Sequence, residues 1–172
     1  MILHLLDADR AELCRDDVLA VWNKAFGPVT DEPDWVSTVW DRHRGRSDYR
    51  LAIAGVDDVV VGFAWGYTGA HGQYWPDLVS RTLGPAAAEW VGGHFEFVEL
   101  AVDPEARGRG VGRALHDRLL DGVPHERALL GTSADPADPA VRLYRSRGWR
   151  RLGLLSAQVQ VMGLRGPGRR PR

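Results

Sequence analysis

Hydrophobic positions in the first half of the chain alternate between strand-like and helix-like spacing. Residues 2–6 predict a short first strand. Residues 11–26 follow with apolar side chains at helical spacing, and Gly27-Pro28 ends that helix. A second helical stretch begins near Pro33 and places four apolar side chains on one side: Trp35, Val36, Val39 and Trp40.

Two runs rich in β-branched and aromatic residues come next. Residues 49–56 and 59–67 read as strands, and the Asp57-Asp58 pair between them predicts a hairpin. The segment 69–93 then interrupts the pattern, with a short helix expected near residues 78–83. An insertion of this length is often functional, and a surface flap without a ligand is the alternative. Its aromatic residues are Tyr74, Trp75 and Trp90.

The second half of the chain is more regular and predicts a mixed α/β sheet. A strand-helix-strand-helix run beside hairpins is typical of that class. The chain shows no linker or repeat, so we expect a single domain over residues 1–165 and a disordered tail over residues 166–172. The predicted elements are a strand at 95–102, a helix at 110–122, a strand at 127–132, a helix at 139–147 and a final antiparallel pair at 149–155 and 157–164.

Composition narrows the function classes. The 172 residues carry a formal net charge of -1, so no global field attracts nucleic acid or an acidic membrane surface. Cys14 is the only cysteine, which excludes an intrachain disulfide and a cysteine-based metal cluster. The apolar run at the N-terminus is too short to span a membrane, so we expect a cytoplasmic protein. We predict no metal site, and we interpret His71 and His94 as ordinary loop histidines, with His94 a minor candidate for a catalytic base.

The segment with the clearest chemistry is the Gly/Arg run Arg107-Gly108-Arg109-Gly110-Val111-Gly112-Arg113 between a predicted strand and helix. A helix N-terminus exposes unpaired N–H groups and a partial positive charge. Glycines let the backbone approach an anion, and the arginines add donors, so the run predicts a phosphate cradle. It lacks the Gly-Lys-Ser/Thr of a P-loop and the Gly-x-Gly-x-x-Gly spacing of a dinucleotide fingerprint.

Two motifs in this half resemble those of the GNAT N-acetyltransferase superfamily. Val102-Asp103-Pro104 followed by Arg-Gly-x-Gly-x-Gly-x-Ala-Leu is similar to its acetyl-CoA motif, in which Arg107, Gly110 and Gly112 fill the defining positions. Downstream, the run from Pro139 to Trp149 looks like the family's Ala-x-x-Leu-Tyr-x-x-x-Gly-Phe helix and strand. The order and separation of the two matches are those of the family. The resemblance covers residues 95–152.

The resemblance implies a fold and a cofactor. It predicts a mixed, mostly antiparallel central sheet that splays between strands four and five, with helices on both faces. Acetyl-CoA would place its pantetheine arm along the backbone of strand four and its pyrophosphate on the Gly/Arg run, with Ala140 of the second motif also assigned to cofactor binding. The implied cofactor residues are Leu100, Ala101, Val102, Arg107, Gly108, Arg109, Gly110, Val111, Gly112, Arg113 and Ala140.

The resemblance also implies three catalytic candidates. Tyr144 matches the family's tyrosine near the CoA sulfur and would protonate the leaving thiolate; a core tyrosine is the alternative. Glu96 matches the base of the histone-modifying branch, and Glu99 matches an acidic position of small-molecule branches. Regular alternation puts the two glutamates on opposite faces, which a bulge in this strand would change. Either could instead bind the substrate ammonium.

The implied function is transfer of acetyl from acetyl-CoA to a primary amine of a small molecule or peptide by direct attack, with a backbone amide near Leu100 stabilising the oxyanion. A non-catalytic CoA-binding module and transfer of a longer acyl group stay open. A homodimer through the last strands is an option that the family offers. The second motif often carries Asn where Ala137 stands, and Asp138 or Ser133 could replace it.

Overall fold

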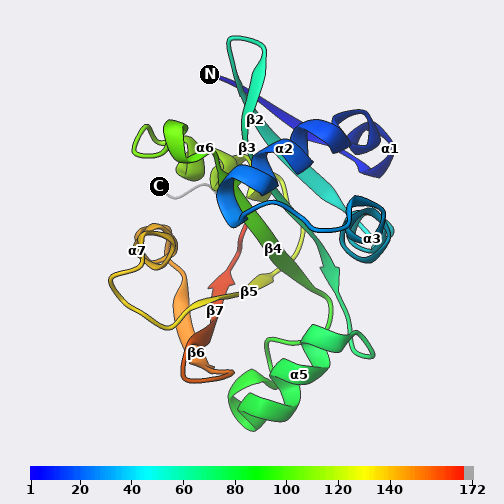
Figure 1. The fold of residues 1–172 in the computed structure, drawn as a ribbon. Helices are drawn as coiled ribbons and strands as arrows, with labels where there is room; N and C mark the ends of the chain where they lie inside the picture. Colours follow the sequence, from blue (N-terminus) through cyan, green and yellow to red (C-terminus); the bar gives the residue numbers. More distant parts are fainter. Residues whose placement is uncertain (169–172) are drawn as a thin grey trace. The chain divides into compact units, whose positions relative to one another are not determined.

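The computed structural model describes residues 1–168 of the chain. Seven strands form a mixed sheet in the order β1-β2-β3-β4-β5-β7-β6, mostly antiparallel with one parallel pair, β4 with β5. Helices flank the strands (Figure 1). These features confirm the predicted fold class. By their contacts the residues group into two compact units, one of residues 1–67 and 98–120, the other of residues 68–97 and from Asp121 onward.

The first unit contains the β1-β2-β3 part of the sheet and the second half of β4. Val56 pairs with Val59 across a two-residue turn in which Asp57 and Asp58 have φ angles of 49° and 63°. Aspartate tolerates this left-handed conformation better than most residues, so the predicted hairpin is confirmed. The strands are β1 (Ile2–Leu6), β2 (Arg50–Val56), β3 (Val59–Gly69) and β4 (His94–Val102).

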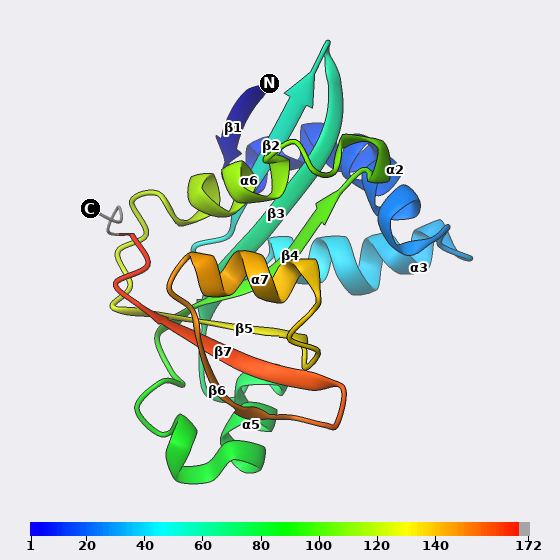
Figure 2. The ribbon, with the colours of Figure 1, turned by 90° about the vertical axis from the view of Figure 1, so that its left-hand side faces the viewer.

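The N-terminal helical region of this unit packs on one face of these strands, and α6 packs on the other. Side chains of Trp35, Trp40, Phe63 and Trp65 share one core cluster, whereas Gly62, next in the alternation, faces α6. Figure 2 shows α6 on the opposite side of β2 and β3 from α2 and α3. The helical elements are α1 (Ala8–Ala11), η1 (Glu12–Cys14), α2 (Arg15–Phe26), α3 (Glu32–Trp35), η2 (Val36–Trp40), α4 (Asp41–Arg44), η4 (Pro104–Ala106) and α6 (Val111–Leu120).

The stretch from Glu32 to Arg44 contains a π-helical turn, η2, which explains how two tryptophans share one face. Trp35 and Trp40 are five residues apart, a spacing that an ordinary α-helix spreads by about 140° around its axis. The π turn brings the two indoles into a stack with their centroids 6.0 Å apart. Both rings are buried, as the helical pattern predicts.

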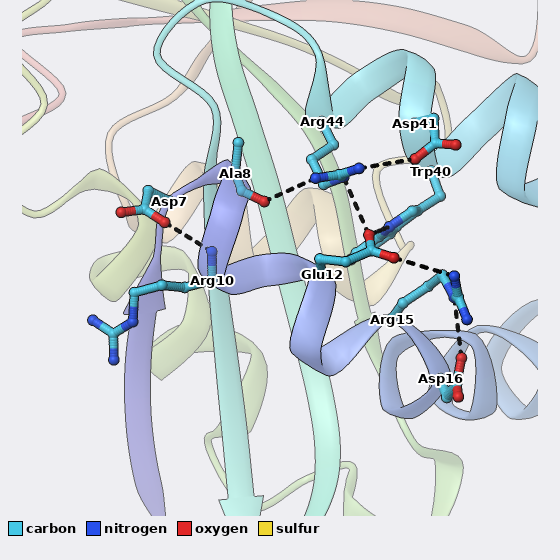
Figure 3. A network of polar contacts seen from close by, with 9 residues as sticks. All are labelled: Asp7, Ala8, Arg10, Glu12, Arg15, Asp16, Trp40, Asp41 and Arg44. Atoms are coloured by element: carbon cyan, nitrogen blue, oxygen red, sulfur yellow. Dashed lines mark hydrogen bonds and ion pairs between the residues drawn. The ribbon is translucent and has the colours of Figure 1, made fainter.

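Glu12 ties this stretch to the helical region before it (Figure 3). Its carboxylate accepts a hydrogen bond from the Trp40 Nε1–H at 3.0 Å and ion-pairs with Arg44 at 3.4 Å and Arg15 at 3.1 Å. Arg44 also donates to the carbonyl of Ala8 at 3.2 Å. These contacts hold η1 and α2 against η2 and α4, the helical segments that cover the aromatic core.

The second unit places α5 and α7 on opposite faces of the β5-β7-β6 strands (Figure 2). Leu129 of β5 and Val161 of β7 pack with Val79 of α5, which lies inside the predicted insertion. Of the tail predicted at residues 166–172, residues 169–172 lie outside the described residues; Gly166 donates its N–H to the Glu126 carbonyl at 2.7 Å. The elements are α5 (Tyr74–Leu83), η3 (Gly84–Ala87), β5 (Arg127–Ser133), α7 (Pro139–Ser146), β6 (Arg150–Leu154) and β7 (Val159–Arg165).

Candidate cofactor and active site

The Gly/Arg loop joins β4 to α6 within the first unit, where the sequence predicts it. Gly108 and Gly110 have φ angles of 74° and 82°, which side-chain-bearing residues rarely adopt. A Cβ added at either position would meet no other atom within 4 Å, so backbone conformation, not crowding, requires these glycines. The loop therefore presents an open backbone surface.

The loop carries exposed cations and leads into the first amides of α6. Arg107, Arg109 and Arg113 are all exposed. Arg107 donates its Nε–H to the carbonyl of Val102 at 3.1 Å, a contact that leaves its two terminal nitrogens to reach outward. The first N–H groups of α6 have no partner inside the helix. The arrangement suits an anion with several oxygens, such as a pyrophosphate.

Helix α6 is held firmly behind the loop. A Cβ at Gly62 of β3 would lie 2.9 Å from Leu115 Cδ1 and 3.3 Å from Val111 Cγ1. The missing side chain thus allows the helix to lie directly on the strand. Val111 and Leu115 are buried there. Close packing fixes the direction in which the N-terminal amides of α6 point.

Glu99 lies in the β4 half that belongs to the first unit, and its environment suits a general base. Burial raises the pKa of its carboxyl to about 7, and a hydrogen bond from the Leu100 amide partly offsets that rise. A base whose pKa is near the working pH is effective, because it is both available and strong enough. The amide implied for the oxyanion at Leu100 is thus engaged by the neighbouring carboxylate.

Strand β4 departs from regular alternation close to Glu99. Val98 and Ala101, three residues apart, both pack against the aromatic core cluster of the first unit. A regular strand would send these side chains to opposite faces. An irregularity between them is what the family's bulge would produce.

Glu96 lies in the second unit beside a histidine that the sequence analysis misjudged. His94 opens β4 and is fully buried, so the interpretation as a loop histidine is wrong. Its Nδ1 accepts the N–H of Gly92 at 3.1 Å, which assigns the ring N–H to Nε2. That nitrogen faces Glu96 Oε2 at 3.8 Å.

Gly69 is the residue that makes room for this pair. A Cβ there would lie 2.3 Å from His94 Nε2 and 2.9 Å from Glu96 Oε2. Both partners are buried, with Glu96 only 6% exposed. Burying an imidazole N–H beyond hydrogen-bond distance of an acceptor costs stability, which is common at functional sites.

We expect Gly69→Ala to lower the free energy of unfolding by about 1–3 kcal/mol, because the new methyl group overlaps His94. Thermal melts of both proteins measure the change. The double variant Gly69→Ala/His94→Ala is the control, since it removes the overlap and should recover part of the loss. Equal melting temperatures for the wild type and Gly69→Ala would show that His94 does not occupy this position.

Tyr144 lies on α7 in the second unit, inside an aromatic group. Its ring meets Phe97 and Trp149 edge-on, with centroids 5.9 and 6.0 Å away, and the residue is 7% exposed. Ala140, on the first turn of α7, donates its N–H to Asp138 Oδ1 at 2.8 Å. Asp138 is therefore the N-cap of α7. Its Oδ1 is engaged by this cap, and Asp138 is one of the two residues that could have replaced the family's asparagine.

The aromatic residues of the variable half are mostly structural. Trp35, Trp40, Trp65 and Tyr67 are buried in the first unit. In the insertion, Trp90 is buried, and a Cβ added at Gly131 would lie 3.5 Å from the Trp75 ring. The aromatic of the insertion that is largely exposed is Tyr74, at 69%.

Two negative findings concern residues 1–168. No helix in this range combines the length and apolar character needed to cross a bilayer. In the same range, His, Cys, Asp and Glu side chains do not gather in groups of three or more that could hold a metal ion.

Sequence reasoning missed two polar pairs. One is His94 with Glu96, and the other is Lys24 with Asp103, whose Nζ and Oδ2 atoms lie 2.7 Å apart. Gly69 belongs to no motif. It makes room for His94 and Glu96, which lie on another strand far along the chain. Lys24 is the only lysine, and this could have marked it as a residue of interest. Its partner Asp103, however, is 79 residues away in the sequence.

Comparison with known proteins places these features in a family. A family model described as acetyltransferase (GNAT) family matches residues 15–149. A GCN5-like protein acetyltransferase of Mycobacterium tuberculosis is 40% identical over 98 residues, 52% of this chain and 48% of that protein. The N-alpha-acetyltransferase RimI of the same organism is 39% identical over 69 residues, 40% of this chain and 43% of that protein. The chain thus spans about half the length of these curated relatives.

Solved structures match over nearly the whole chain. An aminoglycoside 6'-acetyltransferase type Ii superimposes with a TM-score of 0.67 at 18% identity, covering 99% of this chain and all of that one. The ribosomal-protein-S18-alanine N-acetyltransferase of Escherichia coli gives 0.61 at 16% identity, covering 95% and 94%. At these identities the likeness concerns the fold.

Proposed function

Because this chain belongs to the GNAT acetyltransferase family, we propose that it transfers acetyl from acetyl-CoA to a primary amine of a peptide or small molecule. The observation that carries the proposal is the loop between β4 and α6. Its glycines adopt left-handed backbone at Gly108 and Gly110, and the same run carries three exposed arginines and the start of α6. A phosphate-rich ligand is what this surface accommodates.

The cofactor residues each have a physical role in this proposal. The amides from Arg107 to Arg113 bind the pyrophosphate, with the arginine side chains adding charge-assisted hydrogen bonds. The backbone of β4 from Leu100 to Val102 pairs with the pantetheine amides as a further strand would. Ala140, at the start of α7, offers a small side chain on the cofactor.

Glu99 is the proposed general base. The neutral amine attacks the thioester carbonyl carbon, its extra proton passes to the Glu99 carboxylate, and the carbon–sulfur bond breaks as the carbonyl re-forms. As the proton moves to Glu99 during the attack, the carboxyl accepts less strongly from the Leu100 N–H, and that amide can then stabilise the oxyanion until the carbonyl re-forms. Tyr144 donates its hydroxyl proton to the departing thiolate.

Glu96 has the complementary role of holding the acceptor. A carboxylate is a strong acceptor for an ammonium group. The buried Glu96 carboxylate lies 3.8 Å from His94 Nε2, which holds it in a fixed polar setting. In this role Glu96 binds the acceptor as an ammonium group, which loses one proton to water before the neutral amine attacks.

The names of the relatives favour a peptide or protein amine as acceptor. The two that match at 39–40% identity are called a protein acetyltransferase and an N-alpha-acetyltransferase. An antibiotic amine is the second class to test, since an aminoglycoside acetyltransferase shares the fold. No residue of the site selects between these acceptors by itself.

A thiol-release screen tests the proposed function. Purified protein with acetyl-CoA is mixed with a panel of peptides with free N-termini, lysine peptides, polyamines and aminoglycosides. We expect CoA to appear with at least one amine, and propionyl-CoA in parallel measures acyl-chain selectivity. Tight acetyl-CoA binding without release on any amine would favour the CoA-binding module instead.

We expect Tyr144→Phe to lower kcat about ten- to a hundred-fold, the low end for a general acid, because thiolate is a fair leaving group. The substitution keeps the ring that packs on Phe97 and Trp149, so acetyl-CoA affinity and melting temperature should stay unchanged. Single-turnover kinetics measure the chemical step itself. A chemical step of wild-type rate would mean that water protonates the sulfur.

A further inference from the structure

Lys24, the only lysine of the chain, lies beside the cofactor loop although no motif includes it. We propose that Lys24 is a positioning residue for acetyl-CoA binding: it neutralises Asp103 at the entrance of the loop and thereby leaves Arg107 for the pyrophosphate. The inference rests on the proposed function only in taking this loop as the cofactor site.

Asp103 is the residue that shapes the turn from the end of β4 into the Gly/Arg loop. Its own N–H donates to the Val61 carbonyl at 2.9 Å, and its carbonyl accepts the N–H of Ala106 at 2.8 Å. Its Oδ1 caps η4 by accepting the Glu105 N–H at 3.0 Å. The remaining oxygen, Oδ2, receives the Lys24 ammonium at 2.7 Å. Asp103 therefore fixes the turn from β4 into the loop with every polar group it has.

The burial of the two partners is unequal. The Asp103 side chain is 6% exposed, whereas the Lys24 side chain is 54% exposed. An exposed ion pair contributes little by itself. Removing the exposed partner, however, leaves a buried carboxylate without its closest counter-charge. The Lys24 ammonium holds the pKa of the Asp103 carboxyl below its usual range, so this carboxyl is ionised at neutral pH.

Arg107 is the cation that would respond to that loss. Its charge also lowers the pKa of Asp103, and it follows Asp103 by four residues, directly after η4. In the structure Arg107 uses only Nε, on the Val102 carbonyl. Besides Lys24, the cation whose charge acts on Asp103 is Arg107. A guanidinium drawn to Asp103 after the loss of Lys24 would no longer face the phosphates. The negative charge itself would also oppose an anionic ligand.

A mutant cycle separates this role from a structural one. Acetyl-CoA binding is measured by titration calorimetry, and the fold by thermal melts. We expect Lys24→Met to weaken binding about 5- to 20-fold, as expected for the loss of charge-assisted contacts. Lys24→Arg should stay within about two-fold, because a guanidinium also neutralises a carboxylate.

The decisive arm is Lys24→Met/Asp103→Asn. Asparagine keeps a side-chain oxygen that can cap η4 but removes the charge, so the double variant should regain affinity close to that of the wild type. Acetyl-CoA that binds Lys24→Met as tightly as the wild type would overturn the inference. So would a double variant that is as weak as Lys24→Met. A wild-type protein that fails to bind acetyl-CoA would instead contradict the proposed function.

Discussion

Gly112→Glu is expected to abolish measurable acetyl-CoA binding, with at least about a hundred-fold loss of affinity. Gly112 lies in the first turn of α6, where the free amides converge. A glutamate there adds both a side chain and a negative charge at the proposed position of the pyrophosphate. Titration calorimetry measures the loss directly.

The position is chosen because it separates binding from folding. Gly112 is helical, whereas Gly108 and Gly110 have positive φ angles at which any side chain strains the backbone. Gly112→Ala is the matched control: it adds a methyl group without charge, stabilises a helix relative to glycine, and should keep acetyl-CoA affinity within a few-fold. A folded Gly112→Glu variant with wild-type affinity would exclude the loop as the cofactor site.

Glu99→Gln is expected to lower kcat/KM about a hundred-fold at pH 8, within the range for a general base. With a pKa of about 7, the carboxyl is ionised at pH 8 and largely protonated at pH 6. The wild-type profile should therefore rise through about pH 7, and Glu99→Gln should lack that limb. A variant that keeps the limb would move the base to another residue, with Glu96 the first to test.

The same substitution should make the protein more stable at high pH. The folded-state pKa of Glu99 is raised above its unfolded value, so the folded state loses stability as pH rises through about 7. Glutamine does not ionise, and we expect Glu99→Gln to gain about 1–2 kcal/mol over the wild type at pH 8 and little at pH 5. Melting curves at the two pH values measure this. A variant that is less active but more stable at pH 8 cannot owe its loss of activity to misfolding.

Most elements of the fold could be predicted from local sequence patterns. The first strand was predicted at residues 2–6 and is found there. Its end is marked locally, because Asp7 follows it at once and is the N-cap of the next helix. The Asp57-Asp58 turn and the Gly/Arg loop were also placed correctly. These features depend on backbone preferences of consecutive residues, which the sequence states directly.

Features that depend on distant contacts were not accessible in this way. The π turn at Val36–Trp40 places Trp35 and Trp40 on the same buried face, where their rings stack. A regular α-helix would point these two side chains in different directions. His94 was misjudged because only the pairing with Gly69 shows that it is buried next to Glu96. Local propensity does not encode such close approaches.

Acetyl transfer is tested most directly by following an isotopic label from acetyl-CoA to an amine. Purified protein is incubated with [13C]acetyl-CoA and the amine panel, and the products are identified by mass spectrometry. We expect labelled N-acetyl product on at least one amine, formed far more slowly by Glu99→Gln and absent with Gly112→Glu. Unlabelled amines throughout, from a wild-type protein shown to bind acetyl-CoA, would contradict it.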